Sequence, residues 1–345
     1  MLARLLLLLT IALAAGTAQA QVVRPWSEAV VSVRDLDGAA RLFREAGGWR
    51  ETHRGTVDRA ELAYYRLPRA ASAAFLRICA PAAAEGCIRF IRFDGVPQRP
   101  IRLAARPWDS GGIFSVMVRS DNVEALFNDA IRLGWWAESE PIGFSFGGSD
   151  LKNVVLTGPH GINLAVYERS KPPFTAFPLG RISRGFNSMR MVRDQPASLA
   201  FYRDKLGFST VFNTDFVDPA PQSSNFSLPR NYTTSIVRRA AALHPTTGET
   251  GRIEVMQFVG FEGKDVSNHA LPPNLGILSL RYPVDNLPAY RAKLVRQSVR
   301  VDYEAKGVAV TGLGRIDVLA VRDPDGNLTE FYQRSGDNRP RRDRR

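Results

Sequence analysis

The sequence predicts an α+β fold of four similar units, each a strand, a helix and three further strands, paired into two domains. Two observations lead to this prediction. One is internal repetition along the chain, and the other is a tight-turn sequence at residues 323–327 that closes the last unit. Pro, Asp, Gly and Asn favour a turn there, and strand-forming residues lie on both sides. Since a unit of this size cannot bury its own sheet face, the units are expected to pair.

The first and third units repeat most clearly, at residues 26–49 and 185–208. In each, a strand ends at Val-Arg-Asp and a helix-like segment follows, so Asp35 and Asp194 are expected to cap the helices. The second and fourth units are shorter. Their predicted elements are strands at 112–118 and 276–282, helices at 123–133 and 287–295, and final strands within 157–167 and 328–332.

The first twenty residues have the pattern of a cleaved export signal. Arg4 precedes an apolar stretch at residues 5–15, and small residues end the segment at 18–20. The apolar stretch is too short to span a bilayer as a mature helix, so no stable membrane span is predicted. The mature protein is expected to be periplasmic or secreted.

The formal charge of +12 comes from Arg residues scattered over predicted strands and helices, apart from a basic tail. With an export signal present, the tail at residues 335–345 is predicted to be disordered and solvated rather than an arm for nucleic acid. No nucleic-acid partner is therefore expected, and affinity for anionic surfaces or anionic substrates stays open.

The two cysteines, Cys79 and Cys87, flank a short turn between two strand-like segments. In an oxidising compartment a disulfide between them is expected, and two buried free thiols are the alternative. Either way the pair has a structural role.

The closing hairpin at residues 321–332 and the repeated units resemble the vicinal-oxygen-chelate superfamily, which includes glyoxalase I, bleomycin-resistance proteins, type I extradiol dioxygenases and fosfomycin-resistance enzymes. The resemblance implies βαβββ modules paired into two glyoxalase/bleomycin-resistance-like domains, with a ligand cavity inside each pair. We expect modules 1 and 2 to form one domain at residues 21–168 and modules 3 and 4 to form a second at 183–334. A linker is expected at 169–182.

The resemblance also implies two cavity-facing positions in each module, one on the first strand and one on the last. These positions hold Glu28 and Arg89, Ser115 and Ala165, Asn187 and Glu254, and Ser279 and Glu330 in modules 1 to 4. The first domain lacks a plausible metal set, so it is expected to be a scaffold or a degenerate site. In the second, Asn187 and Ser279 stand where extradiol dioxygenases have His, which disfavours iron-dependent ring cleavage.

Glu254 and Glu330 are expected to face each other across the cavity of the second domain. With Asn187 they could hold one divalent cation, with Mg²⁺, Mn²⁺ or Ca²⁺ favoured over iron or zinc. Without metal, one could act as base and the other as acid. The third interpretation is that both carboxylates only form hydrogen bonds to neighbouring groups.

The strand alternation places further side chains beside these carboxylates. The predicted substrate-binding residues are Met191, Phe258, Tyr332 and Arg281. Such an apolar face with one Arg suits a medium-sized organic ligand, although ordinary core packing gives the same pattern. A Pro- and Ser-rich segment at 218–228 is predicted to cover the cavity.

We therefore expect an exported lyase, isomerase or hydrolase that acts on an oxygenated, ring-containing molecule. The first alternative is a non-catalytic binding or sequestration protein of the bleomycin-resistance type. The second is a structural partner in an envelope assembly, which would expose large apolar patches.

Overall fold

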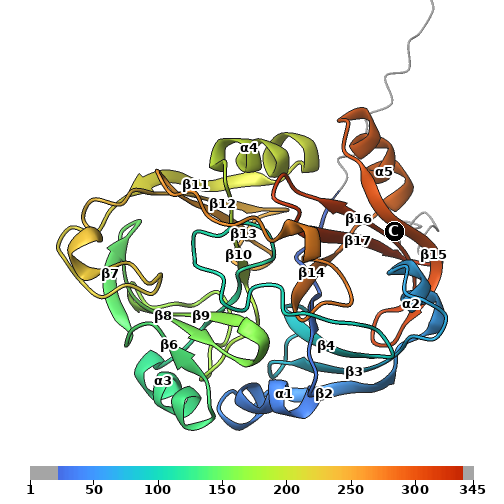
Figure 1. The fold of residues 1–345 in the computed structure, drawn as a ribbon, viewed down its shortest axis with the longest axis horizontal. Helices are drawn as coiled ribbons and strands as arrows, with labels where there is room; N and C mark the ends of the chain where they lie inside the picture. The colour runs from blue at the N-terminus through green and yellow to red at the C-terminus, as the bar shows by residue number, and fades with distance from the viewer. Residues whose placement is uncertain (1–21, 337–345) are drawn as a thin grey trace, which may run out of the picture.

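The structure, a computed structural model, describes residues 22–336. The predicted export signal at residues 1–20 and the basic residues 339–345 lie outside this range. In the described part of the chain, three short 3₁₀ helices lie in the loops, at Pro159–Gly161, Arg230–Tyr232 and Ser267–His269. The other helices and strands form four modules (Figure 1). The predicted α+β architecture of repeated modules is confirmed.

Each module starts with a strand and a helix and continues with further strands. Module 1 contains β1 (Glu28–Ser32), α1 (Leu36–Glu45), β2 (Arg50–Thr56), α2 (Arg59–Tyr64), β3 (Ser72–Cys79) and β4 (Cys87–Asp94). Module 2 contains β5 (Ser115–Arg119), α3 (Val123–Arg132), β6 (Trp136–Ala137), β7 (Ile142–Phe146), β8 (Ser149–Thr157) and β9 (Asn163–Lys171). Module 3 contains β10 (Asn187–Met191), α4 (Gln195–Ala200), a π-helical turn (Phe201–Leu206), β11 (Ser209–Phe216), β12 (Arg238–His244) and β13 (Ile253–Phe258). Module 4 contains β14 (Gly276–Pro283), α5 (Leu287–Arg296), β15 (Val301–Val310), β16 (Gly314–Arg322) and β17 (Leu328–Arg334).

The modules pair as 1 with 4 and as 2 with 3. Modules 1 and 4 form an eight-stranded sheet in the order β15-β16-β17-β14-β1-β4-β3-β2, which we call the outer sheet. Modules 2 and 3 form a nine-stranded sheet in the order β11-β12-β13-β10-β5-β9-β8-β6, with β7 paired to β8, which we call the inner sheet. The two halves of each sheet join through antiparallel first strands, β1 with β14 and β10 with β5.

The predicted pairing of consecutive modules, at 21–168 and 183–334, is therefore wrong. The four modules are built alike, so the edge of one first strand is equally suited to pair with that of several others. Repetition in the sequence reveals the units but does not specify their partners.

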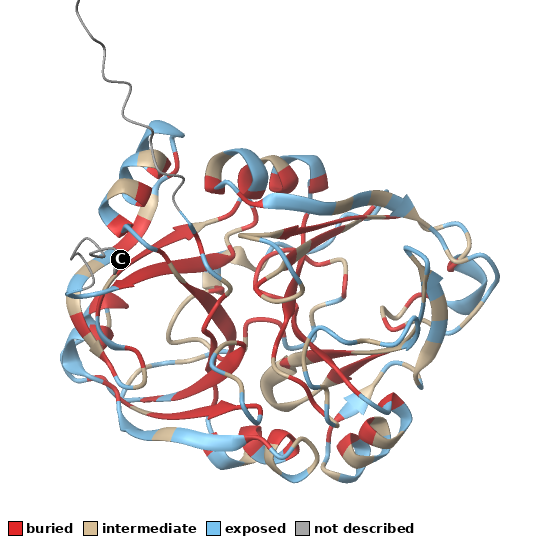
Figure 2. Cartoon of the chain, turned by 180° about the vertical axis from the view of Figure 1, so that it is seen from behind, coloured by how far each residue is buried: buried red, intermediate tan, exposed pale blue. Residues whose placement is uncertain are grey.

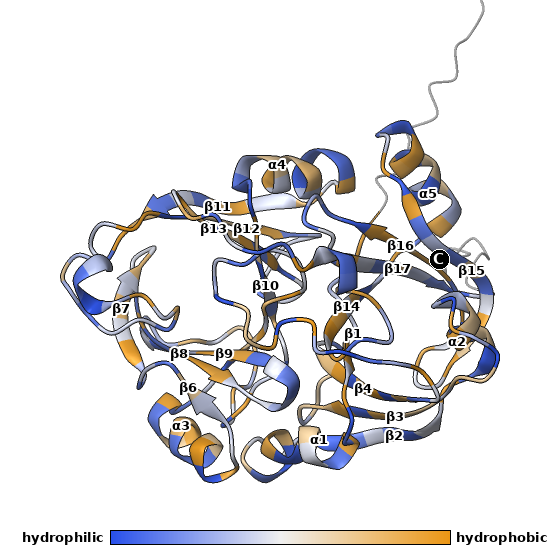
Figure 3. Ribbon diagram, viewed as in Figure 1, coloured by the Kyte–Doolittle hydropathy of each residue, from blue (hydrophilic) through white to orange (hydrophobic). Residues whose placement is uncertain are grey.

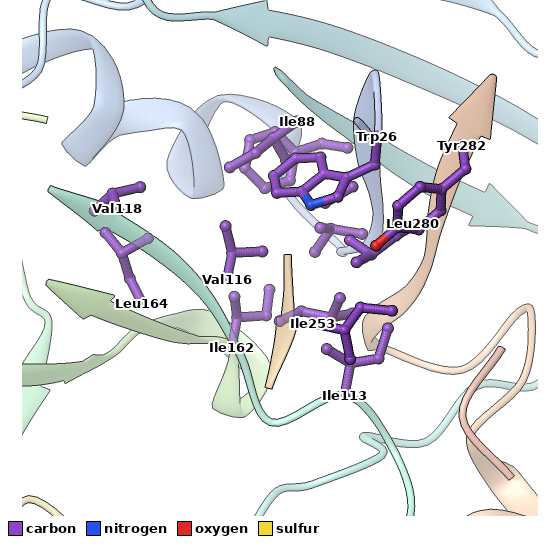
Figure 4. Close-up of a cluster of buried hydrophobic side chains, with 14 of the residues drawn as sticks. Trp26, Ile88, Ile113, Val116, Val118, Ile162, Leu164, Ile253, Leu280 and Tyr282 are labelled. Atoms are coloured by element: carbon purple, nitrogen blue, oxygen red, sulfur yellow. The ribbon is translucent and has the colours of Figure 1, made fainter. Parts of the chain in front are cut away.

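Helices α1, α3, α4 and α5 pack against the sheets through one large cluster of buried side chains, to which both sheets contribute (Figure 4). Its members include Trp26 beside β1, Ile88 in β4, Val116 in β5 and Ile253 in β13. The helices bury their apolar sides against this cluster and expose their polar sides (Figures 2 and 3). Burial of this apolar surface is the main stabilising contribution to the arrangement of the two sheets.

Local expectations for helix starts and for the cysteines agree with the structure. The Asp35 carboxylate accepts hydrogen bonds from the backbone N–H groups of the first turn of α1, and Asp194 caps α4 through the N–H of Ala197. Cys79 and Cys87 form a disulfide between β3 and β4. Within residues 22–336, no helix is both long enough and apolar enough to cross a bilayer.

Candidate functional site

Each sheet curls until its two ends approach each other, so each has an enclosed concave face (Figure 1). In the outer sheet, β2 and β15 are the opposite edge strands, and α2 directly follows β2. The ring centroids of Tyr64 in α2 and Tyr303 in β15 lie 5.8 Å apart. In the inner sheet, Phe146 of β7 lies 5.1 Å from Phe212 of β11. We call these concave sides the outer face and the inner face.

The outer face contains Glu330, and a buried Arg neutralises it. Arg281, the parallel neighbour of Glu330 on β14, donates from Nε to Glu330 Oε2 at 2.9 Å. The same guanidinium donates from Nη1 to Glu28 at 3.0 Å and from Nη2 to Glu61 at 2.7 Å. All four side chains are at most 1% exposed. One guanidinium thus joins three carboxylates from β1, α2 and β17.

Further groups satisfy the remaining oxygens of this cluster. Arg77 donates to Glu28 at 2.8 Å, and Arg89 donates to Glu61 at 3.2 Å. The hydroxyls of Tyr65 and Ser279 both donate to Glu330 Oε1. Burial alone would raise the pKa of Glu28, but the charges of Arg89, Arg281 and Arg77 lower it. The cluster balances three carboxylates with three guanidinium groups, as a buried ionic core requires.

A divalent cation does not fit these residues. Among residues 22–336, no group of three or more His, Cys, Asp or Glu side chains is arranged to hold a metal ion. The carboxylates of the outer face converge, but the guanidinium of Arg281 already lies between them. The predicted metal set of Glu254, Glu330 and Asn187 is not assembled.

Glu254 lies on the other sheet, so the prediction that it faces Glu330 is wrong. Asn187 Nδ2 donates to Glu254 Oε2 at 3.3 Å. Burial raises the pKa of Glu254 to about 7, against the opposing effects of the Asn187 hydrogen bond and the Arg252 charge. Burial and the Glu254 charge also raise the pKa of Tyr167 on β9. The inner face therefore has one carboxyl that changes protonation near neutral pH.

The rest of the inner face consists of thioethers and aromatic rings. Every methionine of the described chain belongs to it, namely Met117, Met189, Met191 and Met256. The predicted ligand residues Met191 and Phe258 are therefore together with Glu254, whereas Arg281 and Tyr332 lie on the outer face. Ser115, opposite Met189 on β5, is fully buried, and its hydroxyl has no hydrogen-bond partner in the described part of the chain.

Two sets of residues on these faces were missed or misplaced by the sequence analysis. Glu61 and Tyr65 come from α2 and the residue after it, an element inserted between β2 and β3 that the module pattern does not contain. Ser115 was assigned to the cavity of the first domain, because module 2 was paired with module 1, and Met117 on the same strand was not singled out. The burial of Glu61 beside Leu62 and Tyr64 has a weak signal in the sequence, a carboxylate within an apolar segment.

Comparisons with known proteins agree with this architecture. Residues 186–331 match the model of the Glyoxalase/Bleomycin resistance protein/Dioxygenase superfamily. Glyoxalase I from Zea mays is similar over 91% of this chain and 93% of its own, with a TM-score of 0.58 and 16% identity. A putative dioxygenase from Bacillus subtilis subsp. subtilis str. 168 is similar over 92% and 87%, with a TM-score of 0.55 and 10% identity. At such identities the solved structures show the fold alone. No curated protein matches the sequence.

Proposed function

We propose that this chain, which contains a Glyoxalase/Bleomycin resistance protein/Dioxygenase superfamily domain at residues 186–331, binds a small organic molecule on its inner face. The observation that carries the proposal is the convergence of all described methionines and several aromatic rings around one carboxyl group with a raised pKa. This favours the binding interpretation over a metal-dependent reaction, because the described residues lack a metal set.

The composition of the inner face suits a ligand site better than a core. Thioethers are flexible and polarisable, so a surface rich in Met adapts to varied apolar ligands. Ligand sites are typically apolar with a few polar groups that fix orientation, and Glu254, Asn187 and the unpartnered hydroxyl of Ser115 are such groups. Several lining rings, including Phe212 and Phe216, also remain partly exposed.

Binding of 4-phenylphenol, a neutral aromatic alcohol, tests the proposal by isothermal titration calorimetry with the full chain. We expect saturable binding, and we expect Met256→Ala to change the Kd at least threefold. Val318→Ala is the matched control, because Val318 is equally buried on the outer face and its truncation should leave the Kd unchanged. No binding by the wild type, or equal effects of the two substitutions, would contradict the proposal.

A second candidate is metal-free proton transfer on the bound molecule, which the raised pKa of Glu254 favours. A carboxyl with a pKa near the working pH is an effective general base and acid. Glu254 would take a proton from a carbon beside a carbonyl group and return it to a neighbouring atom, which is an isomerisation. Ligand turnover that Glu254→Gln leaves intact would exclude this role.

We also propose that the protein is exported, as residues 1–20 predict, and the disulfide between Cys79 and Cys87 supports this because such bonds persist in oxidising compartments. Sequencing the N-terminus of the protein isolated from its native cells should find Gln21 first. An intact Met1 would contradict export by cleavage.

A further inference from the structure

We propose that the ligand carries an aromatic ring that takes the position now held by the ring of Phe226, a residue of the segment covering the inner face. This inference depends on the proposed function, because it names the ligand class of the same site. The covering segment comprises residues 217–237, between β11 and β12, and it contains the stretch predicted as a cover.

The base of the covering segment is fixed to its own module. Arg238 at the start of β12 donates to the Asp218 carboxylate at 2.7 Å, and the Asp218 backbone N–H donates to the carbonyl of Thr233. Arg238 is buried and Thr233 is fully buried. Any opening of the segment is therefore confined to its tip, which lies between these two anchors.

The tip crosses from module 3 to module 2 and is held there by Asn225. The Asn225 side chain accepts from the backbone N–H of Val155 at 3.2 Å and donates to Asn153 Oδ1 at 2.9 Å, both on β8. It also accepts from the hydroxyl of Ser139 at 3.1 Å. These polar contacts from one side chain, together with the burial of Leu228 in the apolar cluster, hold the segment over the inner face. Water can replace hydrogen bonds of this kind when the tip lifts.

Asn225 thereby places the ring of Phe226 between the two modules. Its ring centroid lies 6.1 Å from that of Phe114, which precedes β5, and 5.7 Å from that of Phe258 at the end of β13. Among the described residues, Phe226 is the ring that contacts both. Phe114 and Phe258 are buried, whereas Phe226 is partly exposed. The two buried rings form a binding position for one aromatic ring, and the ring that now fills this position belongs to a loop residue.

The polar groups lie at a fixed separation from this binding position. Glu254 and Phe258 are four residues apart on β13, on the same side of the strand, which corresponds to about 13 Å along it. Met256 lies between them. A ligand that fills both positions has an aromatic ring at one end and a hydrogen-bonding oxygen at the other, with an apolar body over Met256. A linked two-ring phenol has this shape.

Two substitutions in the covering segment test the exchange of rings. Phe226→Ala removes the competing ring, so we expect the Kd for 4-phenylphenol to fall at least threefold. Asn225→Ala releases the tip, and the Kd for 4-phenylphenol should also fall. Tyr232→Ala is the control, since Tyr232 is an exposed aromatic residue of the same segment and its loss should leave the Kd unchanged. Circular dichroism and thermal unfolding of each variant establish that it is folded.

The saturated analogue 4-cyclohexylcyclohexanol tests the requirement for an aromatic ring. We expect it to bind the Phe226→Ala variant at least threefold more weakly than 4-phenylphenol does. If Phe226→Ala leaves the affinity unchanged or weakens it, the ring of Phe226 does not compete with the ligand. This inference is then wrong, while the proposed function stands. If the wild type does not bind the probe, the proposed function itself is wrong.

Discussion

The outer and inner faces share one backbone plan but differ in the residue beside their equivalent carboxylates. On the outer face, Glu330 is paired across parallel strands with Arg281. On the inner face, Glu254 is paired in the same way with Met189. The first carboxylate is held in a buried ionic cluster, and the second has a raised pKa in an apolar setting. The two faces therefore differ in one cross-strand neighbour of the carboxylate, which is Arg281 in the structural core and Met189 in the candidate ligand site.

The outer face also shows how one arginine can join several buried carboxylates. Carboxylates from different elements converge on the outer face, and a guanidinium lies at their centre. An arginine supplies several donors in a fixed plane, so it can satisfy three carboxylates that a metal would otherwise have to join. On the inner face the Arg252 charge only partly opposes the effect of burial on Glu254, and burial favours the protonated form.

The largest expected effect comes from making the outer face resemble the inner one. Arg281→Met leaves three buried carboxylates without their shared cation, and we expect a loss of about 3–5 kcal/mol in the free energy of unfolding, measured with urea. Arg24→Met, which removes an exposed ion pair with Asp285, is the control and should cost less than about 1 kcal/mol. A loss at Arg281 as small as that of the control would show that the cluster does not stabilise the outer face.

The next effect is the pH dependence of stability that Glu254 contributes. Its pKa is about 7 in the folded protein and 4.5 as the usual value, so the folded state binds more protons than the unfolded state between these pH values. Stability should therefore fall as the pH rises from 4.5 to 7, by at most about 3 kcal/mol, and then level off.

Glu254→Gln isolates this contribution, because it removes the titrating group and preserves its shape. As the pH rises to 7, the unfolding free energy of the wild type should fall relative to that of the variant. A constant difference over this range would mean that the pKa of Glu254 is not raised.

A smaller effect is expected from making the inner face resemble the outer one. Met189→Arg places a cation beside Glu254 and should lower its pKa by about 1–3 units, as nearby opposite charges do. Nuclear magnetic resonance titration of the labelled carboxyl group measures this shift. The variant Met191→Arg is a comparison at a neighbouring position on the same strand and should shift the pKa of Glu254 less. Equal shifts would indicate that cross-strand pairing does not decide the behaviour of the carboxyl.

Local features of the structure were accessible from the sequence because they depend on neighbouring residues. The turn at 323–327, the helix caps at Asp35 and Asp194 and the disulfide between adjacent strands all follow from short-range chemistry. Strand alternation also identified Met191 and Phe258 as sharing a side with the carboxylates of their sheet. Alternation does not say which carboxylates share a cavity, since that depends on the partner sheet.

The amino-acid sequence by itself determined the four modules, because turn residues, caps and strand periodicity act within a few positions of the chain. Tertiary structure alone decided that module 1 pairs with module 4 and module 2 with module 3. That pairing brings Glu28 beside Arg281, although most of the chain lies between them in the sequence. It also places Glu254 and Glu330 on different sheets. The physical reason is that similar first strands offer similar edges, so the packing of whole modules against one another selects the partner.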